Sequence, residues 1–260
     1  MAEEEDSTAT ARNELEIALT AATPKEEIVR CLAKVQERIL RGDAESFFLT
    51  GRLYSVGIPD HCPQNTSHGL KALQTAAEQG HLDAQISLSE TSDLDAAQRF
   101  KWCKAAAEQG DLNSLAVLGN HYAKGFGIPK VDMKRAVEHW TAAAAANHMD
   151  AAYNLGLWYL TQRKDQLALR FLTRAADAGD VEAQLELGNC WFHMRAQPLR
   201  AQQCWQRAAA AGNRDALVNL GLLAMEQNEM ETAKTYLKQA ADLGDLEAKQ
   251  CFDDLLLQEE

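Results

Sequence analysis

The stretch from Tyr122 to Trp140, YAKGFGIPKVDMKRAVEHW, carries residue types found in phosphate-binding loops. Gly125 and Gly127 bracket a phenylalanine, and Lys130 follows three residues later. A Walker-type loop needs the pattern GxxxxGK[ST] directly after a β-strand, so that backbone N–H groups and the lysine surround the phosphate. These glycines have neither that spacing nor a preceding strand pattern. The sequence therefore predicts a turn between two helices, in which Gly125 takes a positive φ where the first helix ends.

Histidine and cysteine could bind a metal. His61, Cys62 and His68 share one loop, but three ligands without a fourth make an incomplete zinc site. The seven histidines form no HExxH pair, and the six cysteines form no CxxC pair. Most cysteines lie in apolar helical patterns, such as FKWCKAAA, which indicates buried free thiols. We expect no cofactor or metal. A metal- or cofactor-assembly protein that uses its Cys and His residues stays an alternative.

Other catalytic and nucleic-acid-binding patterns are missing from the sequence. It contains no GxSxG motif and no nucleotide fingerprint. Its 26 basic and 38 acidic side chains give a net charge of −12, which repels nucleic acids and anionic membranes. It has no apolar run long enough to cross a bilayer, and its acidic start, MAEEEDSTAT, is unlike a signal peptide. We expect a cytoplasmic protein that is not an enzyme, binds no nucleic acid and does not insert into membranes.

An internal repeat predicts the elements that position these residues. One motif ends in AAEQG or a related sequence, and its copies end at Gly80, Gly110, Asn147, Gly179, Gly212 and Gly244. Successive copies lie 30 to 37 residues apart (110 − 80 = 30 and 147 − 110 = 37). A second motif, as in VLGNHY and NLGLWY, falls between them. Two motifs in phase indicate one helical hairpin per repeat, which we call helix A and helix B.

Particular residue types recur in the middle of helix A and at the helix ends of each hairpin. Helix A carries a glycine in its middle, at Gly51, Gly119, Gly156, Gly188 and Gly221. Because glycine costs about 1 kcal/mol relative to alanine inside a helix, its recurrence predicts a neighbouring backbone too close for a Cβ atom. Helix B ends in alanines followed by Gly or Asn, which predicts a left-handed C-terminal cap. The Asp that follows, as in GDVEAQ, can cap the next helix A.

This pattern resembles the Sel-1-like repeat, a relative of the tetratricopeptide repeat. The fullest match is LGNHYAKGFGIPKVDMKRAVEHWTAAAAAN, which ends at Asn147. The resemblance implies an all-α fold, an α-solenoid of tetratricopeptide-like hairpins. In such families the hairpins stack into a right-handed superhelix whose concave groove is lined largely by helix A. We therefore expect a scaffold for protein–protein interaction.

The repeats also predict the domain limits. We expect a disordered acidic N-terminus at residues 1–10, capping helices at 11–41, and a solenoid at 42–257 with about six hairpins and a final helix. Within the capping region, one apolar stripe would cover the exposed edge of the first repeat. The stripe consists of Ile28, Cys31, Leu32, Val35 and Ile39.

Candidate binding residues follow from counting along helix A from its glycine. In tetratricopeptide-like arrays the residue after this glycine and those three to five further on can face the groove. An asparagine amide there can bond a peptide backbone, and Lys or Arg can meet acidic groups. Solubility alone is the alternative reason for such polar positions. The candidates from this count are Arg52, Asn120, Lys124, Asn189, Phe192, His193 and Met225, and Tyr153, two residues before Leu155, joins them.

A narrower resemblance concerns the partner. The segment 35–57, VQERILRGDAESFFLTGRLYSVG, is similar to the start of the repeats in Sel-1-like-repeat adaptors of megalin, an endocytic LDL-receptor-related receptor. That likeness implies a cytosolic adaptor for a receptor cytoplasmic tail. A structural homo-oligomer that stacks through its terminal repeats is a further alternative, so the oligomeric state stays open.

Overall fold

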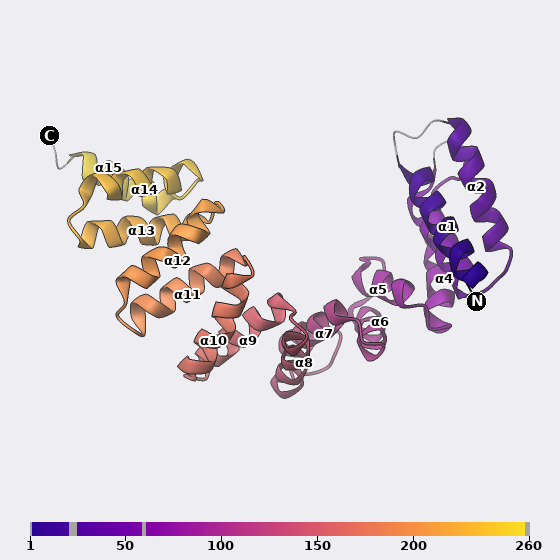
Figure 1. Cartoon of the computed structure of the whole chain (residues 1–260), viewed down its shortest axis with the longest axis horizontal. Helices are drawn as coiled ribbons and strands as arrows, with labels where there is room; N and C mark the ends of the chain where they lie inside the picture. The colour runs from indigo at the N-terminus through magenta and orange to yellow at the C-terminus, as the bar shows by residue number, and fades with distance from the viewer. Residues whose placement is uncertain (1, 21–24, 59–60, 258–260) are drawn as a thin grey trace. The chain divides into compact units, whose positions relative to one another are not determined.

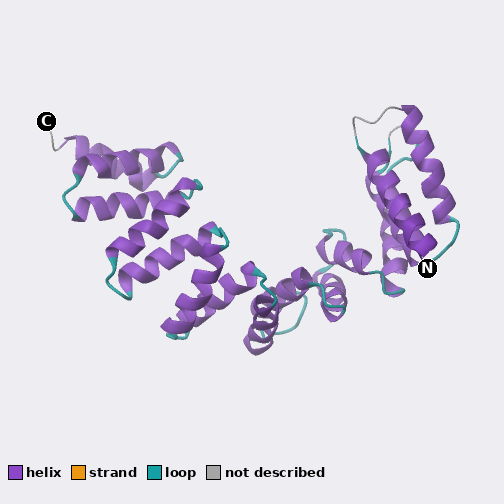
Figure 2. Ribbon diagram, in the orientation of Figure 1, coloured by secondary structure: helices purple, strands orange, loops and turns teal. Residues whose placement is uncertain are grey.

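The computed structural model describes residues 2–20, 25–58 and 61–257, with the side chains of residues 2–9 and 25 left undescribed. All helices and strands assigned in these ranges are α-helices (Figure 2). The only β-type pairing among these residues is an isolated bridge between Ile58 and Cys62. The helices are α1 (Ala2–Leu19), α2 (Lys25–Ile39), α3 (Ala44–Val56), α4 (Thr66–Glu78), α5 (Leu82–Glu90), α6 (Ala96–Glu108), α7 (Leu112–Lys124), α8 (Met133–Ala145), α9 (Met149–Thr161), α10 (Asp165–Asp177), α11 (Val181–His193), α12 (Pro198–Ala210), α13 (Arg214–Glu226), α14 (Met230–Asp242) and α15 (Leu246–Leu257).

These helices form two compact units, residues 1–139 and 140–260. In the first unit, α1 packs on α2 and α3, and the hairpins α3/α4 and α5/α6 follow in order up to α7. In the second unit, the hairpins α9/α10, α11/α12 and α13/α14 stack in sequence and α15 packs on α14 (Figure 1). The expected fold class, an all-α solenoid of helical hairpins, is confirmed.

The N-terminal residues differ from the prediction of disorder. Helix α1 begins at Ala2 and continues to Leu19, so most of the segment expected to be disordered is helical. Its sequence is rich in alanine and glutamate, which have high helix propensity. Packing on α2 supplies the tertiary contact that an isolated short helix lacks.

The capping region has the predicted apolar stripe. Cys31, Leu32 and Val35 of α2 are buried together with Leu49 and Leu53 of α3. The other two stripe residues, Ile28 and Ile39, pack against the same cluster while partly exposed. The expected cover over the first hairpin is therefore present.

The glycines in helix A accommodate large side chains from helix B. A Cβ atom on Gly156 would lie 2.7 Å from Leu172 Cγ, and one on Gly188 would lie 2.5 Å from the Trp205 ring. Gly51 and Gly221 are covered in the same way, by Leu73 and Leu237 respectively. The nearest atoms at all four positions belong to these side chains. At two positions the predicted backbone neighbour is close as well, since a Cβ would lie 3.1 Å from the carbonyl oxygen of Gly69 at Gly51 and 3.3 Å from the backbone nitrogen of Leu172 at Gly156. Each glycine is a socket for one leucine or tryptophan.

The helix ends have the predicted capping residues, and two helices begin with a histidine cap in addition. Asn147 and Gly179 have φ values of 66° and 97°, as left-handed C-terminal positions require. The carboxylate of Asp180 caps α11 by accepting a hydrogen bond from the N–H of Ala183 at 2.6 Å. At α5 and α9 a histidine Nδ1 takes this role, from His81 and His148 respectively. The sequence analysis had not predicted histidine caps.

Neighbouring repeats also cap each other through helix B. Arg174 of α10 donates to the carbonyl oxygen of Ala144 at 2.8 Å, and Arg207 of α12 donates to that of Ala176 at 2.7 Å. Both oxygens lie at the C-terminal end of the preceding helix B, where carbonyl groups lack a partner within the helix and the helix dipole favours a cation. Helices α10 and α12 thus each complete the end of the B helix before them.

The glycine pair at 125 and 127 forms the predicted turn. Gly125 has φ 70° and ends α7 in the left-handed conformation, and its N–H donates to the carbonyl oxygen of His121. Gly127 lies against α6, where a Cβ would collide with the carbonyl oxygen of Ala96. His121 is buried beside Phe126, and burial lowers the pKa of its imidazole. The loop packs on its own hairpins and leaves no cradle for a phosphate between these two glycines.

The described helices differ from a membrane span in length or in polarity. None of them is both long enough and apolar enough to cross a bilayer.

Replacing the glycine socket tests this packing. Gly156→Val should lower the free energy of unfolding by about 3 kcal/mol, since the new side chain overlaps Leu172 and valine crowds the preceding turn. Thr161→Val, at the exposed end of the same helix, is the matched control and should cost less than about 0.5 kcal/mol.

A double variant separates overlap from propensity. Leu172→Ala empties the socket, so adding Gly156→Val to it should cost less than in the native background. The measurement is urea unfolding of all four proteins. Strict additivity of the two substitutions would contradict direct contact between the positions.

Candidate protein-binding site

One face of helix A points away from its own helix B. With about 100° per residue, the positions six and two before the glycine and one and five after it lie about 100° to 160° around the helix from it. We call these positions the open A face. In the second unit they are Asp150, Asn154, Leu157 and Thr161 of α9, Glu182, Glu186, Asn189 and His193 of α11, and Asp215, Asn219, Leu222 and Glu226 of α13.

All twelve positions are exposed or half-buried. The face is mixed in character, since carboxylates, amides and leucines alternate along it. Leu222 is 45% exposed, which is high for a large apolar side chain within a helix. A hydrogen bond of 3.1 Å from Asn219 Nδ2 to Asn189 Oδ1 joins the face of α13 to that of α11.

The predicted binding residues of the first unit have different surroundings. Arg52 is half-buried, and its guanidinium donates to Glu16 of α1 at 2.5 Å. Asn120 is half-buried and Lys124 is exposed, both on α7. Their roles in binding stay predictions.

In the second unit, the predicted residues divide between the surface and the core. His193 is exposed, and Tyr153 is half-buried on α9. Phe192 packs against Trp205 with ring centroids 5.5 Å apart, and Met225 packs against the core of α13–α15. Asn189 Oδ1 already accepts from Trp205 Nε1 at 3.1 Å as well as from Asn219. Part of the predicted set therefore supports the fold, and the set remains untested as a binding site.

The open A face of α3 is covered by a helix from the same chain. Leu15 of α1 is buried in one cluster with Leu49, which lies two residues before Gly51. Ala11 and Ala18 of α1 belong to the same cluster, and Arg52 pairs with Glu16 beside it. Helix α1 thus docks on α3 through an apolar stripe flanked by ion pairs.

The strongest polar contact in this docking belongs to Arg12 of α1. Its Nε and Nη2 donate to the two oxygens of Glu45 at 2.7 and 2.6 Å, and its Nη1 donates to Asp83 at 2.7 Å. The guanidinium also lies over the Phe48 ring, 5.4 Å from its centroid. His81, the cap of α5, contacts both Glu45 and Arg12. A bidentate carboxylate, a second carboxylate and an aromatic face are typical of a specific arginine site.

This arrangement sets the ionisation of Glu45. Burial alone raises the pKa of its carboxyl, but hydrogen bonds from Arg12 and His81, together with the charge of Arg12, lower the pKa to about 2. The Glu45 side chain is only 10% exposed and that of Arg12 is 41% exposed, so solvent screens this ion pair less than a fully exposed one. The same partners raise the pKa of Arg12.

Sequence analysis missed the Arg12 site, although a signal for it was present. An acidic residue occupies the first turn of most A helices, six residues before the socket position, as in Glu45 before Gly51 (51 − 45 = 6). The others are Asp83, Asp150, Glu182, Asp215 and Glu247. Acid in a first turn also favours the helix dipole, so the pattern alone did not reveal a binding role.

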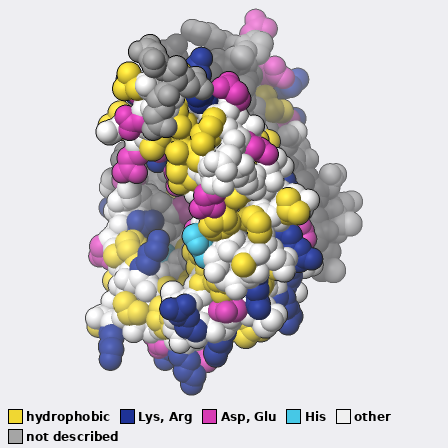
Figure 3. Space-filling view, turned by 90° about the vertical axis from the view of Figure 1, so that its left-hand side faces the viewer, with side chains coloured by type: hydrophobic (Ala, Val, Ile, Leu, Met, Phe, Trp, Pro, Cys, Tyr) yellow, Lys and Arg dark blue, Asp and Glu magenta, His cyan; other side chains and the backbone are white. Residues whose placement is uncertain are grey.

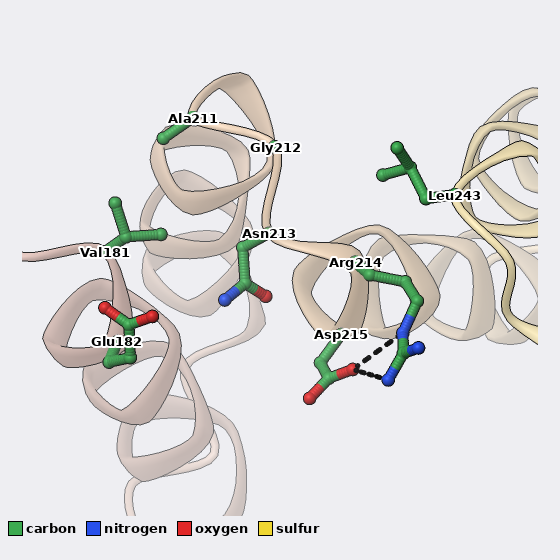
Figure 4. A pocket seen from close by; sticks show the side chains of 8 residues that line it. All are labelled: Val181, Glu182, Ala211, Gly212, Asn213, Arg214, Asp215 and Leu243. Carbon is green, nitrogen blue, oxygen red and sulfur yellow. Dashed lines mark hydrogen bonds and ion pairs between the residues drawn. The ribbon is translucent and has the colours of Figure 1, made fainter.

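A cleft of about 530 Å³ adjoins two of these acids in the second unit. Figure 4 shows Glu182 on one side and Asp215 on the other, with Asn213 between them. Val181, Ala211 and Leu243 supply its apolar lining. Arg214 lies at its edge, 3.4 Å from Asp215 and 3.2 Å from Asp245.

In the ranges that the structure describes, no group of three or more His, Cys, Asp or Glu side chains is placed to hold a metal ion. All six cysteines are free, and four of them are buried. Burial raises the pKa of Cys103 to about 12 and that of Cys190 to about 11, so these two thiols are poor nucleophiles at neutral pH.

Stacked helical hairpins with an open A face define an α-solenoid scaffold, a class that generally works by binding proteins and not by catalysis. The Sel1 repeat model matches residues 46–81, 100–111, 113–148, 150–180, 181–213 and 215–245, which is more than half of the chain. The chain therefore belongs to the Sel1 repeat family. The unmatched part of the second hairpin falls where α5 is short and Ser89 replaces the glycine.

Solved structures support the same fold. A Sel1 repeat protein from Oxalobacter formigenes is 21% identical with a TM-score of 0.74, and the match covers 96% of this chain and 76% of that one. A protective antigen of uropathogenic Escherichia coli, which displays an SLR fold, is 20% identical with a TM-score of 0.66, covering 99% and 66% respectively. At these identities the likeness shows the fold alone. The comparison with curated proteins gives no match.

The Arg12 site predicts an acid-dependent loss of stability. The folded-state pKa of Glu45 is about 2 against an ordinary 4.5, so below pH 4.5 the unfolded chain binds a proton that the folded chain does not. Its contribution is therefore complete above pH 4.5 and is lost as the pH falls towards 2. Glu45→Gln should cost about 2 kcal/mol at pH 7 and progressively less below pH 4.5.

Unfolding of wild type and Glu45→Gln should be compared from pH 7 to pH 3. Glu78→Gln, at an exposed site on α4, is the control and should leave the pH dependence unchanged. Two parallel curves for wild type and Glu45→Gln would show that the Arg12 contact does not hold Glu45 ionised.

Proposed function

We propose that the protein is a non-catalytic adaptor whose second unit binds a segment of a partner protein on the open A face. The observation that carries this proposal is the docking of α1 on α3. There the chain itself supplies a helix that packs Leu15 beside Leu49 and pairs Arg12 with Glu45. The corresponding positions of α9, α11 and α13 are exposed or half-buried.

The second unit is suited to this role because its repeats present one continuous face. The bond between Asn219 and Asn189 fixes the register of two A helices. Leu222 offers exposed apolar area, and His193 lies at the end of the same face. Apolar side chains among polar ones are typical of surfaces that bind proteins reversibly.

On the likeness at residues 35–57 we propose a receptor cytoplasmic tail as the partner and the cytoplasm as the location of the adaptor. In the structure this segment includes Val35, Leu49 and Leu53, which are buried in the first unit. The similar segment therefore includes residues of the surface on which α1 packs, so the likeness can reflect this packing as well as a partner. The isolated cytoplasmic tail of an LDL-receptor-related receptor is the direct probe for this version.

A homo-oligomer is a second candidate, because apolar side chains are exposed at the C-terminal helices. Leu246 is 80% exposed, Leu257 68% and Leu243 53%. Figure 3 looks from the side where Figure 1 shows α13–α15, and apolar side chains reach the surface there among charged ones. Sedimentation of wild type and Leu246→Asp distinguishes this candidate, since only an oligomer built on this surface would dissociate in the variant.

Site-specific photo-cross-linking tests the adaptor proposal. A cross-linking amino acid at position 222 or 193 should capture a partner protein from lysate or the isolated tail. The same group at position 203 of α12 or 238 of α14, both exposed on B helices, should not. Leu222→Asp should weaken binding of the captured partner about tenfold, through loss of apolar contact.

The opposite pattern would overturn the proposal. Capture from positions 203 and 238 alone would move binding to the B helices. Equal affinity of wild type and Leu222→Asp would remove the open A face from the contact.

A further inference from the structure

We infer that the junction of α9 and α11 is an arginine-binding site, which recognises an arginine side chain on the partner segment. The inference rests on the proposed function and names the chemistry of the partner. It comes from comparing this junction with the one between α3 and α5, where Arg12 is bound.

The two junctions match position by position. Asp150 of α9 stands where Glu45 stands in α3, and Glu182 of α11 stands where Asp83 stands in α5. Tyr153 occupies the position of Phe48, whose ring lies beneath the guanidinium of Arg12. The N-terminal cap of the second helix is Asp180 where the first unit has His81.

The two junctions differ in whether a cation of the chain pairs with their carboxylates. Arg12 neutralises the first junction, whereas Asp150, Asp180 and Glu182 have no lysine or arginine within ion-pair distance among the residues that the structure describes. Burial raises the pKa of Asp180, and the nearby charges of Glu182 and Asp150 raise it further. The site therefore combines two exposed carboxylates, a less exposed third one and an aromatic ring, with the positive charge missing.

The adjoining cleft gives an arginine-bearing segment room to continue. It begins at Glu182 of α11, which belongs both to the junction with α9 and to the junction with α13. From there it runs past Asn213 to Asp215 (Figure 4). At the junction of α13 and α15, Arg214 lies 3.2 Å from Asp245, so the chain again supplies its own cation there. Of these three junctions, the one between α9 and α11 is the one whose cation must come from outside the described chain.

Arginine fits this site better than lysine. A planar guanidinium can donate to two carboxylates at once and stack on the Tyr153 ring, as Arg12 does with Glu45, Asp83 and Phe48. A lysine ammonium is a point charge that gains less from the ring and from the paired oxygens.

Binding of synthetic peptides tests the inference. The probe is a dye-labelled, alanine-based helical peptide with arginines one turn apart, compared with otherwise identical peptides that carry lysine or the neutral isostere citrulline. We expect the arginine peptide to bind wild type, the lysine peptide to bind several-fold more weakly, and the citrulline peptide not to bind. Asp150→Asn/Glu182→Gln should weaken arginine-peptide binding about tenfold.

Two further variants separate a built site from general attraction between charges. Asp253→Asn/Asp254→Asn makes the same change of charge at exposed positions of α15 and should leave the affinity unchanged. Tyr153→Leu keeps the charge and should weaken the arginine peptide about threefold while leaving the lysine peptide unaffected. Circular dichroism and melting temperature confirm that each variant is folded.

Three results would overturn the inference. The first is that the arginine peptide does not bind wild type. The second is that Asp253→Asn/Asp254→Asn weakens arginine-peptide binding as much as Asp150→Asn/Glu182→Gln does. The third is that Tyr153→Leu leaves the affinity unchanged and the arginine and lysine peptides bind equally. If the cross-links from position 222 persist in Asp150→Asn/Glu182→Gln, the open A face is the binding surface and arginine is not its ligand. If both experiments fail, the proposed function fails with the inference.

Discussion

The fold depends on one contact that recurs in four of the hairpins, a large side chain of helix B set over a glycine of helix A. Leu172 over Gly156 and Trp205 over Gly188 bring the two helices closer than any side chain at the glycine would allow. The contact also orients helix A. Because the glycine faces helix B, the positions about 100° to 160° away from it cannot be buried by the same hairpin. The socket is therefore the reason that an open A face exists.

Stacking of hairpins depends on a second group of contacts, which act only between neighbours. Arg174 and Arg207 each donate to a carbonyl oxygen of the preceding B helix, and Gln109 donates to the carbonyl oxygen of Gly80 in the same way. Such an array is quasi-one-dimensional, and each repeat is stabilised by its own core and by the two repeats beside it. A polar residue on the open face affects these contacts little. The exposed positions of the open A face can therefore vary more freely than Asn189 and Asn219, which bond each other and, through Asn189, Trp205.

Much of the fold could be predicted from the sequence because its determinants are local. The glycine sockets, the left-handed caps at Asn147 and Gly179, and the turn at Gly125 each depend on residues within one hairpin. The small residue predicts a close neighbour at each glycine, but the sequence does not show that the nearest atoms belong to a side chain and not to the backbone. Asp180 was predicted as a cap from its residue type, whereas the cap role of His81 depends on a ring orientation that no motif specifies.

The candidate site was less predictable because it joins distant residues. Arg12 is 33 residues from Glu45 and 71 from Asp83, and nothing in the first helix indicates which later carboxylates it meets. Asn189 was chosen for its free amide, but Trp205 and Asn219 both bond its oxygen in the folded chain. Residue type could place these side chains on helix A. Residue type could not show which of these side chains form hydrogen bonds within the folded chain.

Helix α1 also shows what a separate partner must do differently. As part of the chain, α1 docks at a high effective concentration, so one buried leucine and a few ion pairs are sufficient. A separate segment must first overcome the entropy of association. The second unit has Glu186 and Asn219 where α3 has Leu49, so it offers less apolar area at the position that holds Leu15 in place. Recognition there must therefore depend on directed polar contacts, and a guanidinium shared between two carboxylates beside an aromatic ring is the strongest such contact that these residues can form.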